Sequence, residues 1–210
     1  MRKTNIILIL LLFCSHAAWS YFGIKIGLNL NHMRFNNIQD SSIQNPVTFQ
    51  IGGFFTWNLN KRFSIQPELY YSQSGVKRKI EIYGQTLILS EDYSYLRLPV
   101  VFKLSIVSND PWNIAPLCGL YGAYNLTAVQ KVSHADQEFS DSIQPLIKRF
   151  DYGWVAGLEI RHKIWNGSLI LDFRFSSGLI NTSRREYSAD KIFHRMIVVQ
   201  VGYWFGSHRK

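Results

Sequence analysis

The chain has 210 residues and a formal net charge of +9, and 47% of its residues are hydrophobic and 15% are aromatic. After the first twenty residues, no window stays apolar over the roughly 18 residues that a membrane-spanning helix requires, which excludes a helical membrane protein. The basic charge does not indicate a nucleic-acid-binding protein, because no basic stripe with interleaved aromatic residues stands apart from the pattern described below.

The N-terminal segment has the pattern of a secretory signal peptide. Arg2 and Lys3 precede an apolar run over residues 6–13, and Ala18-Trp19-Ser20 supplies small residues around a cleavage position. The run is too short to span a membrane as a helix. We therefore expect export, with cleavage after Ser20. Cys118 is then the only cysteine left, so the sequence predicts neither a disulfide framework nor a cysteine metal site.

Eight segments of the exported chain alternate between apolar and polar residues with a period of two, the pattern of β-strands with two unlike faces. In chain order they cover residues 22–31, 47–59, 63–73, 95–106, 112–126, 151–161, 168–179 and 196–205. The seventh is the clearest, since Leu171 and Phe173 alternate with Asp172 and Arg174.

The connections between these segments alternate in length. Residues 60–61, 107–111 and 162–167 form short connections, whereas residues 32–46, 74–94, 127–150 and 181–195 form long polar ones. Short turns at one end and long loops at the other are typical of outer-membrane barrels. A turn near Gly84 and Gln85 predicts that the second long connection extends a hairpin beyond the membrane.

The predicted fold is all-β: an eight-stranded antiparallel up-and-down transmembrane β-barrel with short periplasmic turns and long extracellular loops. The interior of eight strands is just wide enough for side chains. We therefore expect the polar faces to point inward and the apolar faces to meet lipid. The predicted divisions are a signal peptide over 1–20, the barrel over 21–206 and a short basic tail over 207–210.

The inward faces carry nine charged residues, which we predict to form a structural charge network in the lumen. They are Lys25, Glu68, Arg97, Lys103, Asp151, Glu159, Arg161, Asp172 and Arg174. Five positive and four negative charges in so narrow a space must pair, because an unpaired buried charge is costly.

The short turns and the tail hold a second concentration of charge. Their charged residues are Lys61, Arg62, Lys163, Arg209 and Lys210 against Asp110. Two interpretations remain open: a solvated rim that also meets lipid phosphates, or a docking surface for an acidic partner.

Two residue types near the strands need interpretation. The tryptophans near strand ends are predicted to be interfacial girdle residues, namely Trp57, Trp112, Trp154, Trp165 and Trp204. Pro67 and Pro99 each remove a donor from a β-ladder, and we interpret both as marks of β-bulges.

Several stretches together resemble the PorT-like outer-membrane β-barrel family of Bacteroidetes. They are YLRLPVVFKL (95–104), APLCGLYGAYNL (115–126), FDYGWVAGLEI (150–160) and FRFSSGLIN (173–181), joined by GIKIGLNLN and SIQPELYYSQSG. The resemblance covers essentially all of the exported chain. It implies an eight-stranded outer-membrane barrel, carries no shared catalytic site, and connects the family's namesake to type IX secretion. Outer-membrane barrels often end on an aromatic residue of the last strand. This sequence departs from that pattern, because residues 206–210 follow Phe205.

We therefore predict a non-enzymatic integral outer-membrane protein of a Gram-negative bacterium, with a filled lumen and a structural or accessory role in the envelope, including a role related to type IX secretion. The expected partners are outer-membrane lipid, the barrel-assembly machinery, and secretion-system or envelope proteins; no nucleic acid, metal or cofactor is expected. The alternatives are a small porin, a binding protein acting through its extracellular loops, and a soluble barrel with an apolar cavity.

An enzymatic interpretation has little support. His32, His134 and His194 lie near the predicted outer end, together with aspartates and serines that could form an Asp–His or Ser–His–Asp set. Loops this polar contain such residues by chance.

Overall fold

The computed structural model describes residues 20–35, 43–44, 46–82, 85–134, 137–164, 166–180 and 192–205. The predicted signal peptide, apart from Ser20, the tail over 207–210, and Trp165 lie outside these residues. So do the side chains of His32, His134 and His194. Where the chain is described, no helix is long and apolar enough to cross a membrane.

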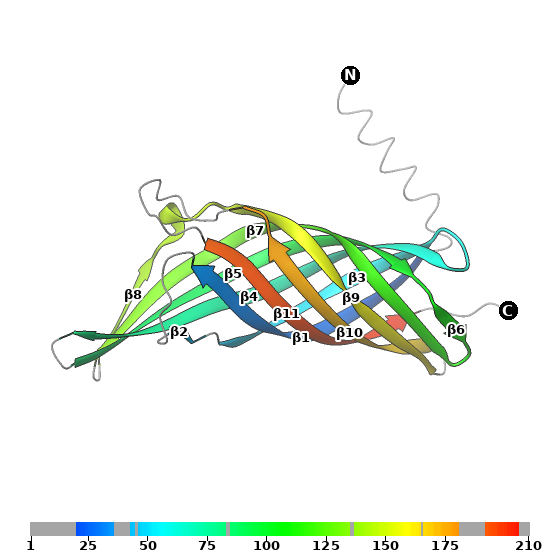
Figure 1. Ribbon diagram of the computed structural model, residues 1–210, viewed down its shortest axis with the longest axis horizontal. Helices are drawn as coiled ribbons and strands as arrows, with labels where there is room; N and C mark the ends of the chain where they lie inside the picture. The colour runs from blue at the N-terminus through cyan, green and yellow to red at the C-terminus, as the bar shows by residue number, and fades with distance from the viewer. Residues whose placement is uncertain are drawn as a thin grey trace, which may run out of the picture.

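Nearly all of the described residues lie in β-strands (Figure 1). In chain order the elements are β1 (Ser20–Phe35), β2 (Ile43–Gln44), β3 (Val47–Asn58), β4 (Phe63–Ile82), β5 (Gln85–Leu104), β6 (Val107–Asn109), β7 (Trp112–His134), β8 (Gln137–Ser142), the 3-10 helix η2 (Gln144–Leu146), β9 (Phe150–Ile164), β10 (Gly167–Gly178) and β11 (Ile192–Phe205).

The eight long strands close into a barrel. β1, β3, β4, β5, β7, β9, β10 and β11 each pair antiparallel with the neighbouring long strand in the chain. β11 returns to β1 with a continuous register from Phe22↔Phe205 to Phe35↔Ile192. The start of β1 and the end of β11 lie at the same end of the barrel as the short connections (Figure 1). The predicted eight-stranded up-and-down fold is confirmed.

The two faces of the strands are arranged as the alternation predicts. Along β10, Leu169 and Phe173 are 50% and 42% exposed, whereas Asp172 and Arg174 are 0% and 5% exposed. The other long strands also place apolar side chains on the outer face, whereas the inward faces hold the buried polar side chains together with some apolar ones such as Phe54, Leu117 and Val155. A soluble barrel with an apolar cavity requires the opposite arrangement, so the observed faces contradict that alternative.

Three strands run far beyond the length that a membrane requires. β4, β5 and β7 contain 20, 20 and 23 residues, against about 9–11 for a tilted transmembrane strand. The hairpin of β4 and β5 continues to Ile82↔Gln85, as its predicted turn implies. β8 pairs with the end of β7. The hairpin extension predicted for residues 74–94 is therefore present, and residues 127–134 and 137–142 of the next long connection also form paired strands, which the alternation did not predict.

A small apolar cluster stabilises this extension. Its buried members are Val76, Tyr93, Tyr95, Tyr121, Ala123, Ala128 and Ile147. Ile147 follows η2, so the segment after β8 folds back over the sheet and its backbone is held there by Ile143 N–H donating to Ala128 O at 3.1 Å.

The prediction of bulges at Pro67 and Pro99 is wrong. Both prolines lie in strands whose register is the same on either side of them, through the pairs Pro67↔Val100 and Pro99↔Tyr121. The register shift of β5 lies between Ser94 and Tyr95 instead. The prolines only interrupt the ladders locally, because the missing N–H removes one hydrogen bond without inserting a residue.

Candidate functional site: the lumen network and the vestibule

The centre of the lumen is occupied by Lys25 of β1. Its Nζ lies 2.5 Å from Asp172 Oδ2, 3.0 Å from Glu159 Oε2 and 3.5 Å from Glu68 Oε1, and all four side chains are completely buried. One ammonium therefore holds three carboxylates that come from β4, β9 and β10.

Other cations complete the arrangement. Arg174 donates from Nη2 to Glu68 Oε1 at 2.7 Å and from Nε to Asp172 Oδ1 at 2.8 Å. Glu159 Oε1 accepts from Lys103 Nζ at 2.9 Å and from Arg161 Nη2 at 3.0 Å. We call the seven connected residues the lumen network: Lys25, Glu68, Lys103, Glu159, Arg161, Asp172 and Arg174. They connect five of the eight barrel strands across the interior.

The β-ladder explains why these cations are needed. Glu159 and Asp172 lie directly opposite each other in the register of β9 and β10, and like charges in that position destabilise a sheet. The stem of Lys25 reaches them past Gly202, where a Cβ atom would lie 2.7 Å from Lys25 Cγ and 2.5 Å from Ile24 O. The glycine therefore provides the space that the lysine uses.

Two of the nine predicted residues lie apart from the network. The Arg97 guanidinium lies over the Tyr121 ring at 4.2 Å, and the Tyr121 hydroxyl donates to Asp151 Oδ2 at 3.3 Å. Tyr121 thus connects Arg97 and Asp151 nearer the extracellular end. All nine residues point into the barrel, and seven of them are brought together.

Uncharged side chains fill much of the remaining lumen, and the sequence reasoning did not single them out. Tyr70 and Phe54 are almost fully buried, Gln50 donates to Gln200 at 3.0 Å, and Thr56 donates to Gln66 at 2.8 Å. Two small cavities of about 20 and 30 Å³ lie toward the extracellular side. Each has room for about one water molecule. These residues stand at strand positions whose alternation points inward, and this alternation could have assigned them to the lumen from the sequence.

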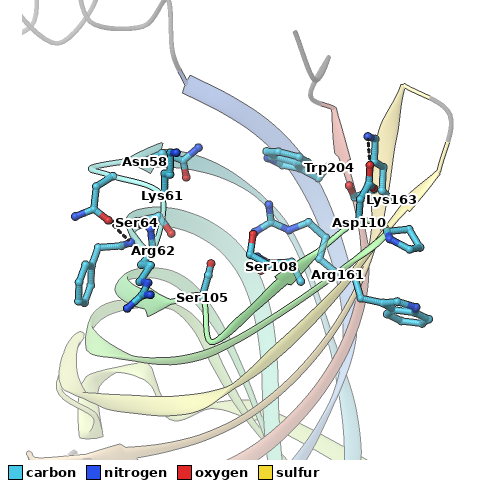
Figure 2. A pocket seen from close by; sticks show the side chains of 16 residues that line it. Asn58, Lys61, Arg62, Ser64, Ser105, Ser108, Asp110, Arg161, Lys163 and Trp204 are labelled. Carbon is cyan, nitrogen blue, oxygen red and sulfur yellow. Dashed lines mark hydrogen bonds and ion pairs between the residues drawn. The ribbon is translucent and has the colours of Figure 1, made fainter. Parts of the chain in front are cut away.

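A larger cavity lies at the short-turn end of the barrel, and we call it the vestibule (Figure 2). Its volume is about 390 Å³, and it is lined by residues from the connections after β3, β5 and β6 and from the neighbouring ends of the strands, including β9. Four basic residues contribute, namely Lys61, Arg62, Arg161 and Lys163, against one acidic residue, Asp110. Arg161 belongs both to the vestibule and to the lumen network.

The girdle prediction is wrong for Trp204. This indole is only 3% exposed, lines the vestibule and lies 4.4 Å from the Arg161 guanidinium. Its neighbours Tyr203 and Phe205 have outward parity, so alternation alone assigns Trp204 to the inside. Trp57, Trp112 and Trp154 are 38%, 48% and 38% exposed on the outer face, where a girdle residue belongs.

Solved barrels of similar architecture come from several bacteria. A major outer membrane protein of Thermus thermophilus aligns with a TM-score of 0.51 and 10% identity, over 89% of this chain and 98% of that one. OprG of Pseudomonas aeruginosa aligns with a TM-score of 0.48 and 10% identity, over 90% and 97%. Ail of Yersinia pestis aligns with a TM-score of 0.45 and 14% identity, over 89% and 99%. At such identities the likeness concerns the fold alone.

No curated protein matches the chain in sequence. The family model described as "Outer membrane protein beta-barrel domain" matches residues 18–184, which is most of the chain. The match covers β1 to β10, and with them every residue of the lumen network. With its closed barrel and its apolar outer surface, this chain belongs to the outer membrane protein beta-barrel domain family and is an outer-membrane protein.

Proposed function

We propose that the protein is a non-enzymatic barrel with a sealed lumen, which acts as a structural or accessory component of the outer membrane. The observation that carries this proposal is the lumen network. Its four cations and three carboxylates are hydrogen-bonded across the interior, and tightly packed, buried side chains leave no path for a solute.

The lumen network also explains why the interior is polar in a protein that would not conduct. A filled interior needs partners for every inward group of the eight strands, and ion pairs between distant strands tie the barrel wall together. Glu159 supports this view best, because three cations from three different strands converge on it. A porin would instead line an open path with separated charges.

We expect the purified protein to show no stable conductance steps in planar bilayers. A variant with Glu68, Tyr70 and Arg174 all changed to alanine should show small steps, because it removes three bulky side chains from one level of the lumen while its charge changes cancel. A general porin measured in the same bilayer establishes the sensitivity. Large, stable steps from the unmodified protein would support the small-porin alternative instead.

The orientation of the barrel can be tested by labelling in cells. Lys79 lies on the extended β4 and β5 hairpin, and Lys61 lies in the short turn after β3; both are exposed. In a Cys118→Ser background, we expect Lys79→Cys to react with an impermeant maleimide on intact cells. Lys61→Cys should react only after the outer membrane is permeabilised. Labelling with the reverse preference would invert the proposed orientation.

The finer expectation from the strand motifs, a PorT-like protein related to type IX secretion, stays a prediction. Its physical basis is that a sealed barrel can serve a secretion apparatus as an anchor rather than as the conduit. Affinity capture of the protein from detergent-solubilised envelopes, followed by identification of bound proteins, tests it. If the captured protein carries no secretion components, the link to type IX secretion is rejected and a general role in the envelope is supported.

A further inference from the structure

We propose that the vestibule binds a phosphate ester that carries neighbouring hydroxyl groups. This inference goes beyond a sealed barrel, because it assigns a ligand to the periplasmic end, where no solute needs to pass. It gives the basic short turns a more specific interpretation than a solvated rim or a docking surface for an acidic partner.

The first argument is charge. Asp110 already accepts from Lys163 Nζ at 2.9 Å (Figure 2). Among the described residues, no carboxylate lies within ion-pair distance of Lys61 or Arg62. The walls therefore hold an excess of positive charge around one hollow, and concave surfaces of one charge concentrate ions of the opposite sign.

The second argument comes from two buried polar atoms. Arg161 Nε and Asn113 Oδ1 are both buried and have no hydrogen-bond partner among the described residues. Both residues line the vestibule. Arg161 offers a donor, which suits a phosphate oxygen, and Asn113 offers an acceptor, which suits a hydroxyl group. A ligand that satisfies both atoms needs an anionic group and a hydroxyl group.

The third argument is that the site is held in place before any ligand arrives. Arg161 is fixed between Glu159 Oε1 at 3.0 Å and the Trp204 ring at 4.4 Å, and its side chain is only 15% exposed. Asn60 Oδ1 accepts from the backbone N–H groups of Arg62 and Phe63 at 2.9 and 2.8 Å, which shapes the turn. Rigid donors lose little entropy on binding.

The volume of the vestibule and the hydroxyl groups in its wall restrict the range of possible ligands further. A volume of about 390 Å³ lies in the range of small-molecule sites. Ser64 and Ser168 are buried in its wall and can bind further oxygen atoms. Two sources share the required chemistry: the glycerol-phosphate headgroup of phosphatidylglycerol in the inner leaflet, and a free sugar phosphate in the periplasm.

The test is a titration of the whole protein, refolded in zwitterionic detergent, with glycerol 3-phosphate at constant ionic strength. The indole resonance of Trp204, assigned through Trp204→Phe, reports on binding. We expect saturable shifts in the unmodified protein. The Lys61→Gln, Arg62→Gln double variant should bind at least tenfold more weakly. The control, Lys77→Gln with Lys79→Gln on the extracellular hairpin, removes the same charge from exposed positions and should bind normally.

Further titrations show whether the ligand is the lipid headgroup or a soluble phosphate ester, and they can overturn the proposal. Titrations in nanodiscs of phosphatidylcholine, with and without phosphatidylglycerol, show whether the lipid competes with glycerol 3-phosphate. Competition assigns the headgroup as the ligand, and undiminished binding of the free ester assigns the soluble source. The proposal is rejected if the shifts do not saturate, or if the two double variants bind equally. Equal affinity for inorganic phosphate and glycerol 3-phosphate would reject the hydroxyl part of the assignment.

Discussion

The Glu159→Leu variant is expected to lose about 3–5 kcal/mol of its unfolding free energy, the usual cost of breaking a buried ion pair from one side. Glu159 is completely buried and meets Lys25, Lys103 and Arg161 at 3.0, 2.9 and 3.0 Å. Its removal leaves a surplus of positive charge in the lumen, most of it on the buried Lys25 and Lys103. Urea unfolding of the protein refolded in lipid vesicles measures the loss.

A matched control is available at the barrel rim. Asp110 also forms an ion pair, with Lys163 at 2.9 Å, but its side chain is 69% exposed. Asp110→Leu should therefore cost less than about 1 kcal/mol. Adding Lys103→Met to Glu159→Leu should recover part of the loss, because it removes one of the stranded cations. Similar losses for Glu159→Leu and Asp110→Leu would contradict the view that the charges of the lumen network are buried and depend on one another.

The Phe173→Arg variant is expected to lose roughly 2–4 kcal/mol, the cost of an arginine at the lipid-facing midplane of a barrel. Phe173 lies near the middle of the 12-residue β10 and is 42% exposed on the outer face. Its neighbour Arg174, by contrast, is held inside by Glu68 and Asp172. The same urea unfolding measurement applies.

The control for this variant is a second outward-facing residue that lies at the membrane surface instead of the midplane. Phe205 is also exposed on the outer face, but it ends β11 at the rim. Phe205→Arg should therefore cost about 0–1 kcal/mol, since the penalty falls near the interface. Phe173→Leu keeps the position apolar and should cost less than Phe173→Arg. If arginine were tolerated equally at both positions, the outer surface of β10 could not be facing hydrocarbon.

The sequence by itself determined the number of barrel strands and the direction of each face. Both follow from a period of two, which depends on the backbone and not on what the strand packs against. The inward direction of Lys25, Asp172 and Arg174 could therefore be read without a structure. The same rule applied to Trp204 would have assigned it to the lumen. The girdle interpretation failed there because position near a strand end was given more weight than parity.

Only the tertiary structure decided which inward charges meet. Lys25 contacts Glu159 and Asp172, which lie 134 and 147 residues away. Parity places a residue inside the barrel, but its height there depends on the stagger of the strands when the sheet closes. That stagger brings seven charges into contact, leaves Arg97 and Asp151 with Tyr121, and places Arg161 in the wall of the vestibule. The structure was also needed to show how far the paired strands continue beyond the membrane, because the sequence indicated only the turn near Gly84 and Gln85.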